Sequence, residues 1–165
     1  MLQLVYRLRD LDFTQFLDVY RESLVIEGEE RYPNCSEFDQ QMLAAEDLYD
    51  YLRFFFNGGG ICAIWLIDEK TVSAMRLEPY RDGFLVAGLE TAPEQRGKGF
   101  ATLLLSAVCQ ALKSQKPCVV YSHIKRTNTP SLRVHKKCGF SQELDYAVLL
   151  DGSVDRQTCT LRIAL

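Results

Sequence analysis

The stretch that decides the fold is Pro93-Glu94-Gln95-Arg96-Gly97-Lys98-Gly99-Phe100-Ala101-Thr102-Leu103-Leu104. An apolar run typical of a β-strand precedes it, and an amphipathic helical pattern begins inside it. A strand that leads into a helix collects unpaired backbone N–H groups at the positive end of the helix dipole. Glycines at such a point let an anion approach closely, because they carry no Cβ atom. The stretch therefore predicts a binding site for a phosphorylated ligand.

Two common phosphate-binding loops do not fit this stretch. A Walker loop needs a glycine five residues before its Gly-Lys pair and Ser or Thr after it, but Ala92 and Gly99 stand there. A dinucleotide-binding fingerprint needs a third glycine, where this chain has Thr102. The pattern Arg/Gln-x-x-Gly-x-Gly/Ala does fit, at Arg96, Gly99 and Ala101. By itself this pattern leaves open a glycine-containing helix start that binds nothing.

A second motif lies farther along the chain, in Asn128-Thr129-Pro130-Ser131-Leu132-Arg133-Val134-His135-Lys136-Lys137-Cys138-Gly139-Phe140. The two motifs together, in this order and spacing, resemble the GNAT superfamily of N-acyltransferases, which use acetyl-CoA. The chain departs from the usual pattern at His135, where a tyrosine is commonest in the family. The second motif is matched at five positions: Asn128, Ser131, Lys137, Gly139 and Phe140.

The resemblance implies an α/β (α+β) fold with a single mixed, mostly antiparallel sheet and helices on both faces. The expected element order is β-α-α-β-β-β-α-β-α-β-β, with residues 1–165 forming one domain. It also implies acetyl-CoA as the cosubstrate and no metal ion. The expected product is an acetylated amine, made by direct transfer within a ternary complex.

The resemblance also assigns residues to the cofactor. The strand before the turn is expected to bulge, so that backbone N–H groups of Leu89 and Thr91 reach the thioester and the pantetheine arm. Asn128 and Ser131, in the second motif, are expected to contact pantetheine. The turn is expected to bind the CoA pyrophosphate through Arg96, Gly97, Lys98, Gly99, Phe100, Ala101 and Thr102.

Two residues are candidates for proton transfer. His135 takes the family's usual general-acid position and would protonate the departing thiolate, since an ordinary histidine titrates near pH ~6.5. Its alternative role is packing or hydrogen bonding within the short helix. Glu90 is the nearest strand carboxylate before the turn and would act as a base through water. If strand alternation points Glu90 away from the cleft, it is a surface charge.

Composition bounds the possible functions. A chain of 165 residues with 47% hydrophobic content is long enough for one domain with its own core. It contains no apolar run of the ~20 residues that span a bilayer, and its first ten residues do not read as a signal peptide. Its six cysteines are spaced singly, without a Cys-x-x-Cys pair. These features predict a cytoplasmic protein that contacts no membrane; monomer and homodimer both stay open.

Charge is segregated along the sequence. Residues 95–142 contain nine Lys or Arg and no Asp or Glu, while residues 27–50 contain eight Asp or Glu and a single basic residue, Arg31. This pattern favours a polyanion such as CoA at one surface and a cation at another. The predicted acceptor is a small-molecule or peptide amine, and a cationic one is an expectation drawn from the acidic cluster. That cluster is Glu27, Glu29, Glu30, Asp39, Glu46 and Asp47.

Two other functions are weighed against the enzyme. The first is a non-catalytic CoA-binding or regulatory domain, which the missing tyrosine would explain. The second is a nucleic-acid-binding module that uses the basic stretch, but the acidic pI of about 5.4 speaks against it. We therefore expect no nucleic acid partner.

Hydrophobic periodicity and turn residues predict the individual elements. Asp12 and Ser36 are expected to cap two helices, the second with an apolar stripe of Phe38, Met42, Leu48, Leu52 and Phe55. Thr129 is expected to cap the short helix that begins at Pro130. The long central helix is expected from about Gly97 to Ser114. The expected strands are residues 2–8, 61–68, 71–78, 83–91 and 118–125, with a final hairpin of 143–150 and 156–164.

Overall fold

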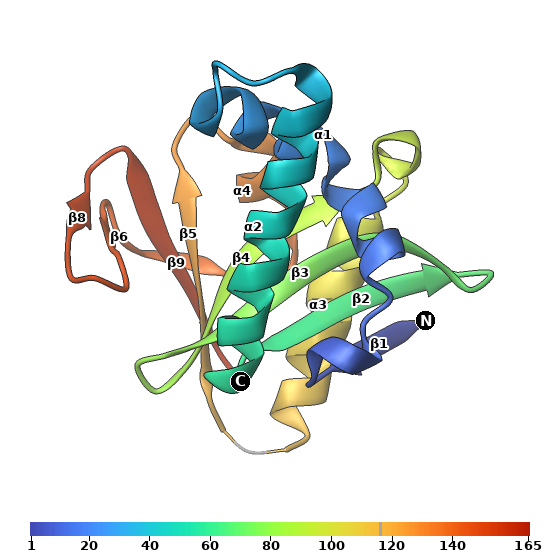
Figure 1. Ribbon diagram of the computed structural model, residues 1–165. Coiled ribbons are helices and arrows are strands. Elements are labelled where there is room, and N and C mark those ends of the chain that lie inside the picture. Colours follow the sequence, from blue (N-terminus) through green and yellow to red (C-terminus); the bar gives the residue numbers. More distant parts are fainter. Residues whose placement is uncertain (116) are drawn as a thin grey trace.

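The computed structural model describes residues 1–115 and 117–165 (Figure 1). Its helices are η1 (Leu8–Asp10), α1 (Phe13–Arg31), α2 (Glu37–Asn57), η2 (Pro93–Gln95), α3 (Phe100–Lys113) and α4 (Thr129–Lys137). Its strands are β1 (Leu2–Val5), β2 (Ile61–Ile67), β3 (Lys70–Tyr80), β4 (Gly83–Thr91), β5 (Val119–Lys125), β6 (Ser141–Leu144), β7 (Ala147–Val148), β8 (Val154–Asp155) and β9 (Thr158–Ala164). Among the described helices, none is long and apolar enough to cross a membrane.

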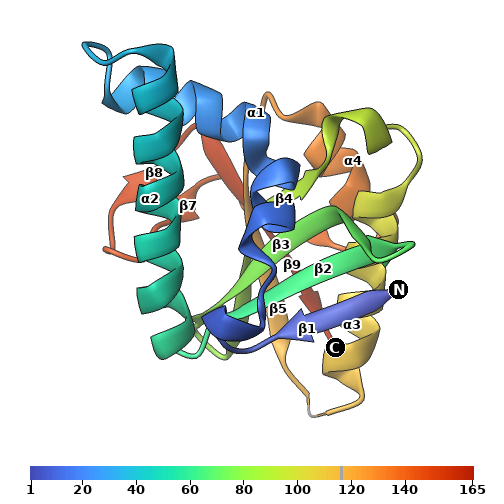
Figure 2. The ribbon, with the colours of Figure 1, turned by 45° about the vertical axis from the view of Figure 1, so that its right-hand side comes forward.

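The main sheet has the strand order β1-β2-β3-β4-β5-β9-β6. Among its described strands, β4 and β5 pair in parallel, and the other neighbouring pairs are antiparallel. Helices α1 and α2 cover one face, whereas α3 and α4 lie on the other (Figures 1 and 2). The mixed, mostly antiparallel sheet with helices on both faces is confirmed as predicted.

Strand alternation divides the core into two layers. In β3, Met75 and Leu77 are fully buried in the layer under α3, together with Leu104 and Val108. Ala74 points to the opposite face, where it packs with residues of α1 and α2. Arg76 lies two positions after Ala74 and therefore also points toward α1 and α2. This placement of a charged side chain matters for the site described below.

The predicted caps of the first two helices are confirmed. The Asp12 side chain accepts a hydrogen bond from the backbone N–H of Gln15, and Ser36 caps α2 in the same way. The predicted cap of α4 is wrong by one residue. Asn128, rather than Thr129, accepts the bond from the N–H of Ser131, because its side-chain oxygen reaches the third residue on.

Part of the predicted apolar stripe of α2 is wrong. Leu52 and Phe55 are buried, but Phe38 is 72% exposed and Met42 is 49% exposed. The reason is geometric: the connection between α1 and α2 projects away from the sheet, so the first turns of α2 have little sheet surface to cover (Figure 2).

Several predicted boundaries also change. The first strand ends at Val5, which pairs with Cys62 of β2, and is followed by η1. Helix α3 begins at Phe100 rather than Gly97, since Gly97 and Gly99 have positive φ angles of 77° and 86° that no α-helix contains. The predicted final hairpin becomes β6 paired with β9, with β7 and β8 forming a small separate ribbon between them.

A bulge in β4 creates the opening in the sheet. Between Arg76, paired with Ala87, and Ala74, paired with Glu90, β4 advances three residues while β3 advances two. Gly88 lies in this bulge with a φ of +57°, a left-handed conformation that favours glycine. The parallel pairing of β4 with β5 ends at Val86, and the two strands then diverge (Figure 1).

Candidate active site

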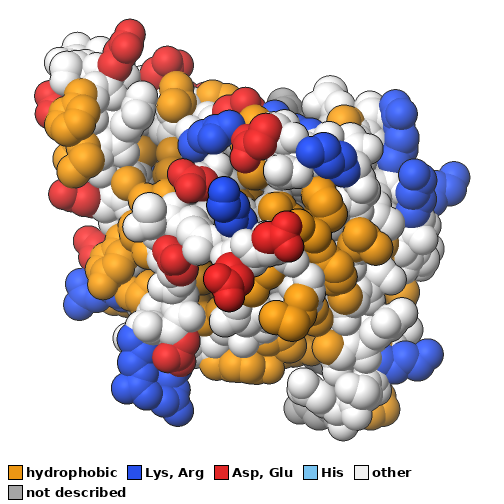
Figure 3. Space-filling view, turned by 90° about the vertical axis from the view of Figure 1, so that its right-hand side faces the viewer, with side chains coloured by type: hydrophobic (Ala, Val, Ile, Leu, Met, Phe, Trp, Pro, Cys, Tyr) orange, Lys and Arg blue, Asp and Glu red, His pale blue; other side chains and the backbone are white. Residues whose placement is uncertain are grey.

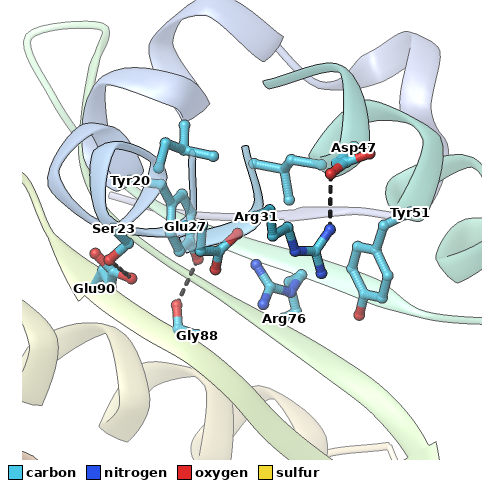
Figure 4. A pocket seen from close by; sticks show the side chains of 11 residues that line it. Tyr20, Ser23, Glu27, Arg31, Asp47, Tyr51, Arg76, Gly88 and Glu90 are labelled. Atoms are coloured by element: carbon cyan, nitrogen blue, oxygen red, sulfur yellow. Dashed lines mark hydrogen bonds and ion pairs between the residues drawn. The ribbon is translucent and has the colours of Figure 1, made fainter. Parts of the chain in front are cut away.

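Two cavities meet at the bulge of β4. The first, which we call the strand cleft, measures about 540 Å³ and lies between the diverging strands β4 and β5, with α4 at its side. The second, which we call the charged pocket, measures about 360 Å³ and lies between β3, β4, α1 and α2 (Figure 4). Three residues line both cavities: Ser23, Gly88 and Glu90.

The strand cleft gathers most of the residues predicted for the thioester arm. It is lined by five of them, two from the strand before the phosphate turn and three from the second motif: Leu89, Glu90, Asn128, Ser131 and His135. Thr91 is not among its lining residues. Its hydroxyl lies 3.1 Å from that of Ser73 and its carbonyl accepts a bond from Arg96 Nε at 3.2 Å. The cleft therefore joins the end of β4 to the second motif, whereas neither Thr91 nor residues 96–102 are among its lining residues.

The predicted phosphate turn is a row of free backbone donors. From Gly97 to Thr102, six consecutive N–H groups have no hydrogen-bond acceptor within the described residues. Gly99 occupies the N-cap position with no side chain, so no side-chain hydrogen bond among the described residues caps the start of α3. The turn therefore offers an anion the partial positive charge of a helix N-terminus together with several donors.

The side chain of Arg96 is engaged elsewhere. Its Nη1 lies 2.6 Å from Glu22 Oε2 on α1, and Arg21 forms a similar 2.6 Å pair with Glu94. These pairs fasten the turn to α1. They also show that the charge segregation of the sequence is not kept in space, since acidic and basic side chains lie side by side across the face shown in Figure 3.

His135 is a buried, neutral group with one open nitrogen. Its side chain lies against Phe140, with ring centroids 5.1 Å apart, and the residue is 1% exposed. Nδ1 lies 2.9 Å from the carbonyl oxygen of Ser131, which assigns the proton of the neutral ring to Nδ1. Nε2 is buried without a partner in the described structure. Burial lowers the pKa of His135, so the ring is uncharged at neutral pH.

Glu90 stands at the junction of the two cavities. The Ser23 hydroxyl donates a 2.7 Å hydrogen bond to its carboxylate. Burial raises the pKa of Glu90 above its ordinary value, and the hydrogen bond from Ser23 opposes this shift. A raised pKa makes this carboxylate a stronger base than an ordinary glutamate.

The charged pocket was missed by sequence reasoning. Arg76 comes from β3, and its guanidinium lies over the rings of Tyr20 and Tyr51, 5.5 Å and 5.2 Å from their centroids. The Tyr20 hydroxyl donates a 2.5 Å bond to the carbonyl of Gly88, which fixes the bulge from the side of α1. These residues are far apart in sequence and belong to no local motif, so no sequence signal joins them.

The acidic cluster predicted for a cationic acceptor does not converge. Only Glu27 and Asp47 line the charged pocket. Asp47 pairs with Arg31 at 2.8 Å and accepts a 2.7 Å bond from Tyr32, and this bond from Tyr32 is the main cause of the lowered pKa of Asp47. Asp39 accepts a bond from Ser36 at the start of α2. In the described residues, no group of three or more His, Cys, Asp or Glu is placed to hold a metal ion.

Solved structures of acetyltransferases share this fold. Ribosomal-protein-alanine N-acetyltransferase from Brucella melitensis is 17% identical and matches over 99% of each chain, with a TM-score of 0.66. PaiA N-acetyltransferase from Thermoplasma acidophilum, solved with coenzyme A, is 16% identical over 100% of this chain and 99% of that one, with a TM-score of 0.66. Phosphinothricin acetyltransferase from Sinorhizobium meliloti, solved with AcCoA, is 18% identical over 99% of this chain and 88% of that one, with a TM-score of 0.65.

Sequence comparison gives the family. No curated protein sequence matches this chain. The model of the acetyltransferase (GNAT) family matches residues 9–140, which include the bulged strand, the phosphate turn and the second motif. The chain therefore belongs to the GNAT acetyltransferase family.

Proposed function

We propose that this protein is an acetyl-CoA-dependent N-acetyltransferase that transfers the acetyl group directly to a primary amine of a small molecule or peptide. The observation that carries the proposal is the meeting of two cavities at Ser23, Gly88 and Glu90. The strand cleft would hold the thioester arm of the cofactor, and the charged pocket would hold the acceptor. A carboxylate suited to proton transfer stands where they join. Relatives of the same fold have been solved with coenzyme A and with AcCoA.

Backbone groups would hold the cofactor. The N–H groups from Gly97 to Thr102 would bind the pyrophosphate, and the pantetheine arm would run through the strand cleft past Asn128 and Ser131. The bulge removes Leu89 from the ladder with β3, so its N–H is available to stabilise the oxyanion that develops on the thioester carbonyl. Because these donors are fixed before the reaction, they need no reorganisation during it.

The proton balance assigns a role to each candidate. The acceptor arrives as an ammonium ion and gives one proton to Glu90, whose raised pKa suits this step. The free amine attacks the thioester carbon, and the C–S bond breaks as the tetrahedral intermediate collapses. The second proton leaves the nitrogen and is carried to the departing sulfur by Nε2 of His135. Since His135 begins uncharged, it can act as an acid only after it has taken up this proton.

Calorimetric titration with acetyl-CoA tests the proposal first. We expect saturable, micromolar binding, and weaker binding of dephospho-CoA if basic residues near the turn contact the 3′-phosphate. Release of coenzyme A in the presence of an amine panel is then followed by chromatography, because the exposed thiol of Cys35 would react with thiol reagents. Absence of acetyl-CoA binding contradicts the proposal. Binding without turnover of any amine would support the non-catalytic CoA-binding alternative.

A further inference from the structure

We infer that the acceptor amine also carries a carboxylate close to its nitrogen, as an α-amino acid does, and that Arg76 binds this carboxylate. The inference rests on the proposed function, because it concerns the acceptor of the same reaction. It starts from the charged pocket, where Arg76 lies between Tyr20 and Tyr51 (Figure 4).

Arg76 is a cation with no carboxylate in direct contact in the described structure, although Glu78 and Glu90 act on it electrostatically from farther away. It forms no ion pair within residues 1–115 and 117–165, and its Nε is buried without a hydrogen-bond acceptor. The carboxylate of Glu78, two residues along the same strand, accepts a bond from Tyr51 instead. Removing a guanidinium from water without a counter-charge is costly, and contacts with aromatic faces offset only part of that cost. An anionic ligand in contact with the guanidinium would supply the close counter-charge that Glu78 and Glu90 do not provide from their greater distance.

The second arginine of the pocket provides an internal contrast. Arg31 also lines the charged pocket, but it is already paired with Asp47 at 2.8 Å. The groups left without an ion pair in the described structure are therefore Arg76 on one side and Glu27 and Glu90 on the other. One cation and two carboxylates complement a molecule with one negative and one positive group. A plain amine would leave Arg76 unsatisfied, and a doubly charged phosphate would be repelled by both glutamates.

The geometry of the bulge sets the spacing between the two groups of the acceptor. A Cβ atom placed on Gly88 would lie 2.8 Å from Nη2 of Arg76, so the guanidinium sits directly against the bulge. Gly88 and Glu90 also line the strand cleft, where the thioester would be attacked. A carboxylate bound to Arg76 is therefore only a short distance from an amine at Glu90. Guanidinium binds carboxylate in a bidentate manner, which would orient the amine toward the thioester.

The test compares matched acceptors on the wild-type protein. Phenylalanine, histidine and lysine are each compared with the corresponding decarboxylated amine (phenethylamine, histamine and cadaverine) and with the methyl ester, which keeps the shape but removes the charge. We expect at least one free amino acid to be acetylated with a kcat/KM about 100-fold above that of its amine and ester, as charge-assisted bidentate pairing implies. Equal turnover of the amines, or no turnover of any of the three amino acids, would overturn the inference.

Variants assign the effect to Arg76. Arg76→Gln should lower kcat/KM for the preferred amino acid by about 100-fold, mainly through KM, and remove the preference over the ester. Arg76→Lys, which keeps the charge but loses the bidentate geometry, should recover part of this loss. The control is Arg53→Gln, since Arg53 is an exposed residue of α2 paired with Asp50 outside both cavities. If Arg76→Gln does not fold, Arg76→Lys and the comparison of free acid with methyl ester still test whether Arg76 binds the carboxylate.

The two proposals fail in different ways. If acetyl-CoA does not bind, the proposed function fails. If acetyl-CoA binds with equal affinity to wild type and Arg76→Gln, and the variant keeps full preference for the free amino acid, only the inference about Arg76 fails.

Discussion

The strand cleft and the charged pocket share three residues, yet they are built in different ways. The cleft owes its shape to backbone: a bulge in β4 and the divergence of β4 from β5. The pocket owes its character to charged and aromatic side chains from α1, α2 and β3. Under the proposed function, the cofactor would be bound mainly by backbone groups, whereas side chains that can change without altering the fold would select the acceptor.

The largest effect is expected from Glu90→Gln, which changes the junction itself. Removing the proton acceptor should lower kcat by about 10²- to 10⁴-fold, while acetyl-CoA affinity stays the same. Because burial raises the pKa of Glu90, the wild-type rate should fall on acidification already above the ordinary carboxyl range, and the variant should lack this fall. Steady-state rates across pH, with acetyl-CoA titration alongside, check both expectations.

Glu46→Gln is the matched control, since Glu46 is an exposed residue of α2. An unchanged kcat in Glu90→Gln would show that the amine loses its proton to water rather than to the protein. Glu90 would then have no chemical role between the two cavities.

The next largest effect concerns the affinity for acetyl-CoA alone. Gly99→Ala places a Cβ atom at a φ of +86°, with no atom within 4 Å of that position, so the change acts only through backbone strain of about 1–2 kcal/mol. The start of α3 would shift to relieve this strain and misplace the phosphate donors. We expect acetyl-CoA to bind about 10-fold more weakly, with the acceptor KM unchanged.

Gly152→Ala is a matched control for this strain. Gly152 has a φ of +84° and equally open surroundings, but it lies in the turn between β7 and β8. It should lose similar stability with no change in cofactor affinity. Equal cofactor affinity in the wild type and Gly99→Ala would mean that the turn from Gly97 to Thr102 does not hold the pyrophosphate.

The division between the two cavities also explains how much the sequence could predict. The turn at Gly97–Gly99 and the helix start at Asn128 are local patterns, so the elements they begin follow from neighbouring residues. The helix cap was still misplaced by one residue, because Asn128 and Thr129 are both good caps and only the backbone geometry selects between them.

Arg76 shows why the rest could not be predicted. In the sequence it is one charged residue in a strand pattern, which reads as a solvent-exposed position. Only the tertiary structure places Tyr20 and Tyr51 around it, and only the bulge brings Gly88 against it. The bulge itself depends on the register between β3 and β4, which no local motif records.

A smaller effect is expected from Tyr20→Phe, which tests how the pocket supports the bulge. The change removes the 2.5 Å bond to the Gly88 carbonyl but keeps the aromatic face over Arg76. Unfolding free energy should fall by about 1 kcal/mol, and kcat should fall several-fold because the bulge is less fixed. Tyr80→Phe removes a comparable 3.0 Å bond to the Val148 carbonyl. It should lower stability similarly and leave kcat unchanged; equal kcat in both variants would mean that the bulge needs no support from α1.

The smallest effect concerns the charge state of His135 in the cleft. Its pKa is lowered by burial, so the folded protein binds fewer protons than the unfolded chain once pH falls below the ordinary histidine value near ~6.5. Stability should therefore fall between about pH 6.5 and the lowered pKa. His135→Gln should lessen this fall by up to about 1 kcal/mol in urea unfolding at pH 7.5, 6.5 and 5.5.

His123, on β5, is the comparison for this last effect. Its pKa is also lowered, by burial and by the charge of Arg81, and its Nε2 is likewise buried without a partner in the described structure. His123→Gln should remove another part of the same pH dependence, and the double variant measures how far the effects of the two histidines, which line the same cleft, add. If His135→Gln loses as much stability on acidification as the wild type, the ring is charged in the folded protein at that pH. His135 could then protonate the departing sulfur directly, without first taking the proton of the amine.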